Sequence, residues 1–162
     1  LEMSYDLWIN QMKSPNDALL RLKEVPSGRD ERTVFDNMTY NFDSAAGIRY
    51  EVDVTQPRGQ KIKILSMADL SPFDFDKTYR VALNSYRGNG GGELLTKGAG
   101  IPHKDLTSRI VFSTAKDLRY YLMQEIKKQK QMNPQPLNQW RMVPTQWVEP
   151  AAKREYNLLF GE

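Results

Sequence analysis

Hydrophobic positions at the start of the chain follow the spacing of a helix. They form one stripe of a helical surface at Leu1, Tyr5, Trp8, Ile9 and Met12. We therefore predict a helix over residues 1–12. No Ser, Thr, Asp or Asn precedes the first apolar position to cap this helix. The chain is thus expected to begin inside an element, as a piece of a longer protein would.

Polar residues dominate the stretch that follows, from residue 15 to residue 37. It contains Pro26, Ser27 and Gly28 next to the charged run RDER. Turn-forming residues and charges without an apolar period are typical of surface connections. We therefore predict a long, mobile connection here, with no catalytic role.

Apolar and charged residues then alternate in two neighbouring stretches. Residues 48–54 place apolar side chains at every second position with charges between them, and residues 61–64 do the same. A period of two predicts strands with one buried face each. Pro57 and Gly59 supply turn chemistry between the two stretches. We therefore predict an antiparallel hairpin.

Three further elements are predicted downstream. A third alternating run predicts a strand over residues 79–83, which ends in the glycine-rich segment NSYRGNGGG. Thr114 and Asp117 form a T-x-x-D capping box, which predicts a helix. The apolar positions of this helix are Leu118, Tyr121, Leu122 and Ile126. The proline-punctuated residues 133–150 predict a last strand or an extended arm, anchored by Trp140, Met142 and Trp147.

Together these elements indicate an α+β domain of layered sheet and helix. Strands joined by hairpins, with helices at both ends, favour this architecture over a doubly wound parallel sheet. A chain of 162 residues with 40% hydrophobic residues can close one core. Its 23 Lys and Arg against 20 Asp and Glu leave a net charge of only +3, spread along the chain, so we expect no nucleic-acid partner. No apolar run approaches the roughly 20 residues of a membrane span.

The chain is poor in residues that bind metal ions. It has one histidine and no cysteine, so a dinuclear metal centre within it is not expected. His103 lies in the loop sequence GAGIPHKDL, where we interpret it as a solvent-exposed side chain. Asp74 and Asp76 lack the glycine and the distal glutamate of an EF-hand loop. We interpret these two aspartates as part of a turn.

The segment from Asn84 to Gly92 is the main candidate for ligand binding. Its glycines allow a ligand to approach the backbone closely, and they are Gly88, Gly90, Gly91 and Gly92. The segment lacks the Gly-Lys-Ser/Thr and G-x-G-x-x-G fingerprints of phosphate binding. Tyr86 could stack a planar base beside the exposed backbone, which is worth ~1 to 3 kcal/mol. The alternative is a glycine-rich turn with Tyr86 packed in the core.

Two ordered stretches, AGIRYEVDVTQPRGQKIKI and DKTYRVALNSYRGNGGGELL, resemble the carboxy-terminal domain of the 5'-nucleotidase and cyclic-nucleotide phosphodiesterase family. The most specific part is a hydrophobic strand that ends in Asn84, followed by Tyr86 and the Asn-Gly-Gly loop at residues 89–91. The resemblance implies a substrate-binding domain over residues 1–144, truncated at its amino-terminal side, and a tail over residues 145–162.

The resemblance also implies a division of labour. In this family an amino-terminal domain holds two divalent metal ions and the hydrolytic water, while the carboxy-terminal domain binds base, ribose and phosphate. Only the second domain is represented here, so the chain alone is expected to be inactive and to need no cofactor of its own. The family's first stacking aromatic and its Asn-Gly-Gly-x-x-Arg segment lie upstream of Leu1.

Site roles follow residue by residue from the same resemblance. Tyr86 corresponds to the second stacking aromatic, and Gly47 is expected to line the base edge. The backbone that shapes the nucleoside pocket belongs to Arg87, Gly88, Asn89, Gly90 and Gly91. The family usually places an aspartate after the Gly-Gly pair to bind the ribose hydroxyls, whereas this chain has Gly92 and then Glu93. Either Glu93 reads the ribose from a shifted position, or the site has relaxed.

The parent implied by the resemblance is a bacterial, periplasmic or cell-surface enzyme that hydrolyses nucleoside 5'-phosphates, with cyclic nucleotides left open. Its partners are the nucleotide substrate and an upstream metallophosphatase domain of the same chain. Two alternatives come from other classes. One is a module that binds a nucleoside without turnover, and the other is a structural domain whose glycine loop only turns the chain.

Overall fold

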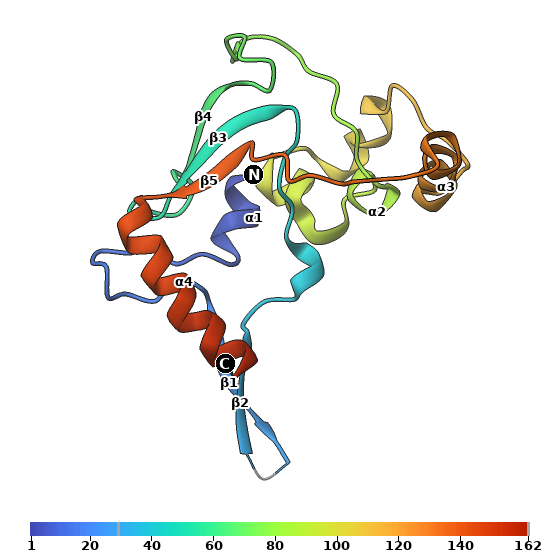
Figure 1. Ribbon diagram of the computed structural model, residues 1–162. Helices are drawn as coiled ribbons and strands as arrows, with labels where there is room; N and C mark the ends of the chain where they lie inside the picture. The colour runs from blue at the N-terminus through green and yellow to red at the C-terminus, as the bar shows by residue number, and fades with distance from the viewer. Residues whose placement is uncertain (29, 162) are drawn as a thin grey trace. The chain divides into compact units, whose positions relative to one another are not determined.

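The computed structural model describes residues 1–28 and 30–161 (Figure 1). The chain folds into two compact units. The sheet unit comprises Leu1–Lys77 and Asn138–Glu162, and the loop unit comprises Thr78–Leu137. Helices and small, mostly antiparallel sheets make this an α+β protein, as predicted. No helix among the described residues combines the length and the apolar character needed to cross a bilayer.

A three-stranded sheet is the centre of the sheet unit. Its strands, in order across the sheet, are β4 (Ile62–Met67), β3 (Ile48–Asp53) and β5 (Trp140–Val143). β3 and β4 form the predicted antiparallel hairpin, with Tyr50 opposite Ile64, and β5 runs parallel to β3. Tyr50 and Val52 are buried, which is the physical cause of the alternation in the sequence.

The predicted helix at the start of the chain is shorter than its apolar spacing suggests. α1 spans Glu2–Asp6 only. Ile9 then forms an antiparallel bridge with Leu20, and the N–H of Met12 donates to the carbonyl of Val54 at 2.7 Å. The prediction of helix is therefore wrong beyond residue 6, because hydrogen bonds to other segments replace the helical ones. The stripe still marks burial, since its buried members are Tyr5, Trp8, Ile9 and Met12.

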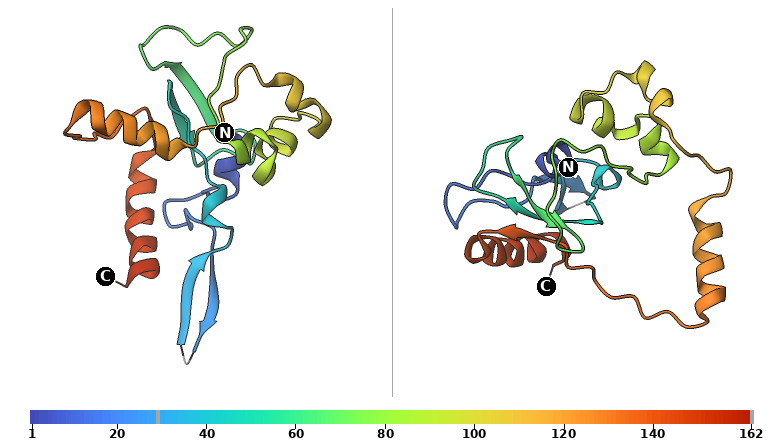
Figure 2. Two further views of the ribbon diagram at one scale, coloured as in Figure 1. Left: turned by 90° about the vertical axis from the view of Figure 1, so that its right-hand side faces the viewer. Right: turned by 90° about the horizontal axis from the view of Figure 1, so that it is seen from above.

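The stretch predicted as a mobile connection contains a hairpin instead. β1 (Leu22–Ser27) pairs antiparallel with β2 (Asp30–Phe35), and residue 29 between them lies outside the described residues. Figure 1 and Figure 2 show this hairpin projecting from the sheet unit as a narrow ribbon. None of its described side chains is fully buried. A hairpin without a buried face needs no alternation of apolar and polar residues, so its strands could not be predicted from periodicity.

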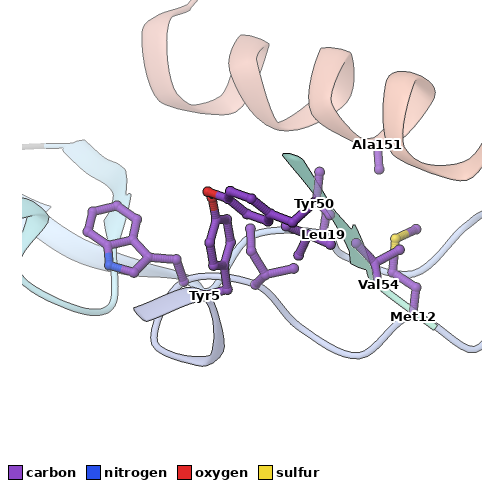
Figure 3. Packing of buried hydrophobic residues seen from close by; sticks show 9 residues of the cluster. Tyr5, Met12, Leu19, Tyr50, Val54 and Ala151 are labelled. Carbon is purple, nitrogen blue, oxygen red and sulfur yellow. The ribbon is translucent and has the colours of Figure 1, made fainter. Parts of the chain in front are cut away.

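Aromatic side chains from three elements meet in the core of the sheet unit. The hydroxyls of Tyr5 on α1 and Tyr50 on β3 lie 2.7 Å apart, and the N–H of Ala45 donates to the Tyr50 hydroxyl at 3.2 Å. Trp140 of β5 stacks on Tyr50 with an interplanar angle of 13°. Figure 3 shows the two tyrosines meeting at their hydroxyls. Burial, and then the Tyr50 hydrogen bond, raise the pKa of Tyr5 well above its ordinary value, so its phenol stays neutral.

Two carboxylates of α1 hold the edge strand β4 and the turn before it. Glu2 accepts the backbone N–H groups of Lys61 at 3.0 Å and Ile62 at 2.7 Å. Asp6 accepts the N–H of Gly59 at 2.8 Å and lies 2.8 Å from the ammonium of Lys61. The side chains of Lys61 and Asp6 are only 2% and 3% exposed, so this ion pair is shielded from solvent. It fixes the start of β4 on α1.

The predicted last strand is present as β5, but the residues after it form a helix rather than an extended arm. α4 spans Thr145–Phe160 and belongs to the sheet unit, where Ala151 is fully buried in the core. The carboxylate of Glu155 accepts the N–H groups of Leu19 and Leu20, each at 2.6 Å. Pro150 lies inside this helix. Because proline removes a helical hydrogen bond, its presence had favoured an extended segment over a helix. Residue 162 lies outside the described part of the chain.

The loop unit contains several short helical turns and one longer helix. In chain order its elements are α2 (Ser85–Gly88), the turns η2 (Gly91–Glu93), η3 (Leu94–Gly98), η4 (His103–Asp105) and η5 (Thr107–Arg109), and the helix α3 (Leu118–Gln129). One further 3₁₀ turn, η1 (Thr39–Asn41), lies in the sheet unit.

α3 is the helix predicted from the apolar spacing of residues 118–126, but it begins differently. Asp117 is its N-cap and accepts the N–H of Tyr120 at 2.9 Å. The hydroxyl of Thr114 lies 2.7 Å from that of Tyr121 instead. The predicted T-x-x-D box is therefore wrong, because a single aspartate at the N-cap satisfies the first turn.

The predicted strand over residues 79–83 does not form in the structure. The described residues 79–83 are assigned to no strand, and Val81 and Leu83 are 72% and 49% exposed. Alternation predicts a strand only when one set of side chains is buried against a core, and these two apolar side chains are not buried. The prediction of a strand is therefore wrong.

The buried ion pair provides a test of the sheet unit. We expect Lys61→Met to lower the free energy of unfolding by about 3 kcal/mol, the lower end for a broken buried ion pair, because the buried Asp6 carboxylate keeps only the exposed Arg58, 3.9 Å away, as a cation. Lys63→Met, on an exposed position of the same strand, is the matched control and should change it by less than about 0.5 kcal/mol. Urea unfolding followed by circular dichroism measures both values. Equal effects of the two substitutions would contradict the role given to Lys61.

Candidate functional site

The candidate binding segment begins with a capped helical turn. Asn84 accepts the N–H of Arg87 at 2.8 Å and so caps α2. This helix ends within four residues, and the N–H of Gly90 donates to the carbonyl of Arg87 at 2.9 Å. A cap at the start and a turn at the end hold Tyr86 on a short, defined piece of backbone.

Left-handed backbone shapes the rest of the loop. Gly90 and Gly92 have φ values of 89° and 70°, which glycine adopts at little cost. Glu93 also has a positive φ, of 62°, and a residue with a side chain in this region is strained by roughly 1 to 3 kcal/mol. Such strain persists only where surrounding contacts over-determine the conformation. The loop between α2 and η3 therefore has a defined conformation that is held by its own contacts.

Tyr86 lies on the surface of this loop. Its side chain is half exposed, so the alternative of a core tyrosine does not describe its position in the loop unit. The ring packs directly on Gly91, because a Cβ placed there would lie 2.5 Å from Tyr86 Cε2. The guanidinium of Arg87 lies 5.3 Å from the centroid of the ring, within cation–π reach. Glycine at position 91 and the neighbouring cation thus hold the ring in place.

The remaining residues of the predicted pocket differ in their exposure. Arg87 is buried and donates to the carbonyl of Gly91 at 3.1 Å, so its guanidinium supports the loop from inside. Gly88 has open space around its Cα, and Asn89 is exposed at the end of α2. Together with Gly90 they follow Tyr86 as one continuous segment, and Arg87 and Gly91 contact the ring.

Glu93 engages a neighbour on its own turn. Its carboxylate lies 2.8 Å from the ammonium of Lys97, four residues later, and both side chains are largely exposed. The ion pair directs the carboxylate along η3. Gly92 before it carries no side chain that could replace the aspartate usual in the family.

Gly47 is part of the sheet unit, whereas residues 84–93 belong to the loop unit. Its N–H donates to the side-chain oxygen of Gln139 at 2.9 Å, and its carbonyl accepts the N–H of Ala68 at 2.9 Å. With a φ of 94° it turns the chain into β3 and ties that turn to both neighbouring segments. The positive φ of this turn accounts for a glycine at position 47 without a role in ligand binding.

His103 contacts the glycine loop, which the sequence did not reveal. It is exposed, as predicted, but a Cβ on Gly90 would lie 3.2 Å from its Cδ2 atom and 3.1 Å from Leu106 Cδ1. No motif links residues 90 and 103, so only the fold brings η4 to the loop. Sequence reasoning could have found the residue only by its being the single imidazole of the chain.

Acidic residues and the histidine do not gather into a metal centre in the part of the chain that the structure describes. No group of three or more His, Cys, Asp or Glu side chains there could hold a metal ion. Asp74 and Asp76 form the predicted turn, in which Asp74 accepts the N–H of Asp76 at 2.9 Å. The residues that the structure describes thus do not fit the dinuclear metal centre that the resemblance implies for the parent.

Comparison with protein families identifies the domain type. The family described as 5'-nucleotidase, C-terminal domain, matches residues 13–97, which is more than half of the chain. The matched region includes the β3–β4 hairpin and the whole loop from Asn84 to Glu93. The wider domain bounds of 1–144 stay a prediction. No solved structure matches the chain significantly.

Three curated bacterial proteins are similar in sequence. The trifunctional nucleotide phosphoesterase protein YfkN of Bacillus subtilis is 35% identical over 130 residues, covering 72% of this chain and 8% of the relative. Proteins named 2',3'-cyclic-nucleotide 2'-phosphodiesterase/3'-nucleotidase from Yersinia enterocolitica and Salmonella typhimurium are 31% and 32% identical, covering 69% and 65% of this chain.

The chain spans only 8% to 18% of the length of these relatives, so it corresponds to one part of much larger enzymes. The family match covers the hairpin and the glycine loop together, which are the two stretches that carry the resemblance in the sequence. The resemblance is confirmed, and the chain belongs to the 5'-nucleotidase C-terminal domain family.

Proposed function

We propose that this chain is the nucleotide-recognition domain of a metal-dependent 5'-nucleotidase-type phosphohydrolase. The observation that carries the proposal is the half-exposed ring of Tyr86, held on a strained glycine loop. A fixed aromatic face offers a stacking surface worth ~1 to 3 kcal/mol per base. Because the ring is already held by Gly91 and Arg87, little side-chain entropy is lost when a base stacks on it.

The loop backbone would complete the nucleoside pocket. Residues 87–91 follow Tyr86 without side chains at the glycine positions. The N–H groups of residues 87–90 already donate within the loop, so carbonyl oxygens, which have two lone pairs each, would bond the polar edge of a base. Specificity for the base would therefore come from backbone geometry, while the tyrosine contributes affinity for any base.

Hydrolysis would require a second domain. One histidine, no cysteine and scattered carboxylates cannot supply the several ligands that two metal ions need. We therefore propose that divalent metal ions and the attacking water belong to an upstream metallophosphatase domain of the same parent chain. This chain's own part is to bind and position the nucleotide, and alone it would hydrolyse nothing.

The names of the relatives support nucleotides as the substrate class. All three are named as nucleotide phosphoesterases or nucleotidases, and two names include 2',3'-cyclic nucleotides. We propose that the parent hydrolyses nucleoside phosphomonoesters, and that it acts in the periplasm or at the cell surface. A nucleoside-binding module without catalysis is the rival. An assay of the full-length parent against nucleotides with different bases distinguishes the two functions.

Replacement of Tyr86 tests the stacking role. In the full-length parent we expect Tyr86→Ala to raise KM by about 5- to 100-fold and to change kcat much less, because the base is remote from phosphorus. Tyr86→Phe keeps the ring and is the matched control, with nearly unchanged kinetics. Steady-state assays with a nucleoside monophosphate measure both variants. If Tyr86→Ala behaves as wild type, the stacking role is wrong.

Gly91 tests whether the ring must be held in place. A Cβ at this position would lie 2.5 Å from Tyr86 Cε2 and 2.6 Å from its carbonyl oxygen, so Gly91→Ala has to displace the ring or the loop. We expect the same direction of change in KM as for Tyr86→Ala. Gly88→Ala is the control, because no heavy atom lies within 4 Å of a Cβ there. Equal KM values for the two variants would show that the geometry of this loop does not matter for binding.

The Glu93–Lys97 ion pair leads to a prediction on ribose recognition. We expect Glu93→Gln to leave KM within about twofold for ribonucleotides and deoxyribonucleotides alike, because the carboxylate is engaged by Lys97 and not held toward the loop. A ribose hydrogen bond to this charge would instead be worth about 1.5 to 3 kcal/mol, or roughly 10- to 100-fold. A wild-type preference for ribose that disappears in Glu93→Gln would refute the relaxed site.

A further inference from the structure

The imidazole of His103 is pressed against the glycine loop from a different part of the loop unit. The distance from its Cδ2 atom to a Cβ on Gly90 would be 3.2 Å, and from its Nε2 atom 3.5 Å. Leu106, which is buried, lies against the same face of Gly90. The segment that carries η4 and η5 thus packs on the left-handed turn at Gly90, and His103 is the polar side chain that it brings there.

Two aromatic rings consequently border consecutive residues of the loop. The ring of Tyr86 packs on Gly91, and that of His103 packs on Gly90. The Tyr86 side chain is half exposed, and His103 is also exposed. A planar ligand stacked on Tyr86 would therefore lie next to the backbone of Gly90 and Gly91, and the imidazole of His103 packs on the same piece of backbone.

The ring nitrogens of His103 are not used by the fold. Among the residues that the structure describes, its side chain has no hydrogen-bond or ion-pair partner. The charged groups of the loop are engaged with each other or with the backbone, since Glu93 pairs with Lys97 and Arg87 bonds the carbonyl of Gly91. Of the side chains around this turn, the imidazole thus keeps its hydrogen-bonding capacity for a ligand.

We propose that His103 is a second ligand-binding side chain of this site, whose ring nitrogen hydrogen-bonds the polar edge of a nucleoside stacked on Tyr86. This inference rests on the proposed function and assigns it a specificity-determining residue. A neutral imidazole carries one donor and one acceptor nitrogen, and base edges present both kinds of group. His103 would therefore contribute to the choice among bases, which Tyr86 cannot make because every base has a stacking face.

Equilibrium binding of nucleosides to the full-length protein tests the proposal. Adenosine, guanosine, cytidine and uridine carry no phosphate to hydrolyse, so calorimetry with each gives a dissociation constant without turnover. For the nucleoside that binds wild type most tightly, we expect His103→Ala to raise the dissociation constant by about 2- to 10-fold, as loss of one hydrogen bond does. His103→Gln should restore most of the affinity, because its amide also offers a donor and an acceptor.

Two controls make the outcomes distinct. Lys104→Ala alters the neighbouring residue of η4 and should bind as wild type, whereas Tyr86→Ala should weaken every nucleoside. If Tyr86→Ala weakens binding but His103→Ala does not, or if Gln is no better than Ala at position 103, the role of His103 is wrong and the proposed function stands. If wild type binds none of the nucleosides, or Tyr86→Ala binds them as well as wild type, the proposed function fails and the inference with it.

Discussion

The hydrogen bond between the hydroxyls of Tyr5 and Tyr50 joins α1 to the central strand of the sheet at a point without access to water. A buried hydroxyl without a partner costs on the order of 1 to 3 kcal/mol, so each tyrosine requires the other to be in place. The N–H of Ala45 adds a donor to the same oxygen, and Trp140 stacks on the Tyr50 ring. Positions of α1, β3 and β5 are thus linked through one pair of phenols.

The loop unit achieves order by a different physical route. Its candidate site has few buried apolar side chains, and its shape comes from backbone conformation. Positive φ at Gly90, Gly92 and Glu93 sets the path of the chain, while Arg87 and the Tyr86 ring fill the space that the glycines leave. Such a loop is sensitive to single methyl groups, because an added Cβ at a packed glycine has no room to relax.

Elements that are defined by residues close together in the sequence could be predicted from it, whereas elements that depend on contacts with distant segments could not. The β3–β4 hairpin and α3 followed from apolar spacing, because the turn residues and the N-cap Asp117 that delimit them are adjacent in sequence. The α1 stripe marked burial but not helix, because Ile9 and Met12 bond distant segments. Tyr86 was visible in the sequence as an aromatic beside glycines. The contact of His103 with Gly90 was not, because it depends on how η4 folds back and no periodicity encodes that.

The Glu155 carboxylate, which accepts two N–H groups from residues 136 and 135 positions earlier, has a consequence for the order of folding. The ribosome releases residues 1–77 before the loop unit, and the segment that holds β5 and α4 only after it. Nascent β3 therefore waits with one edge unpaired while 60 intervening residues are made. Contacts of such long range form slowly and leave hydrophobic surface exposed during synthesis, so the edge of β3 is open to aggregation until β5 and α4 have been made.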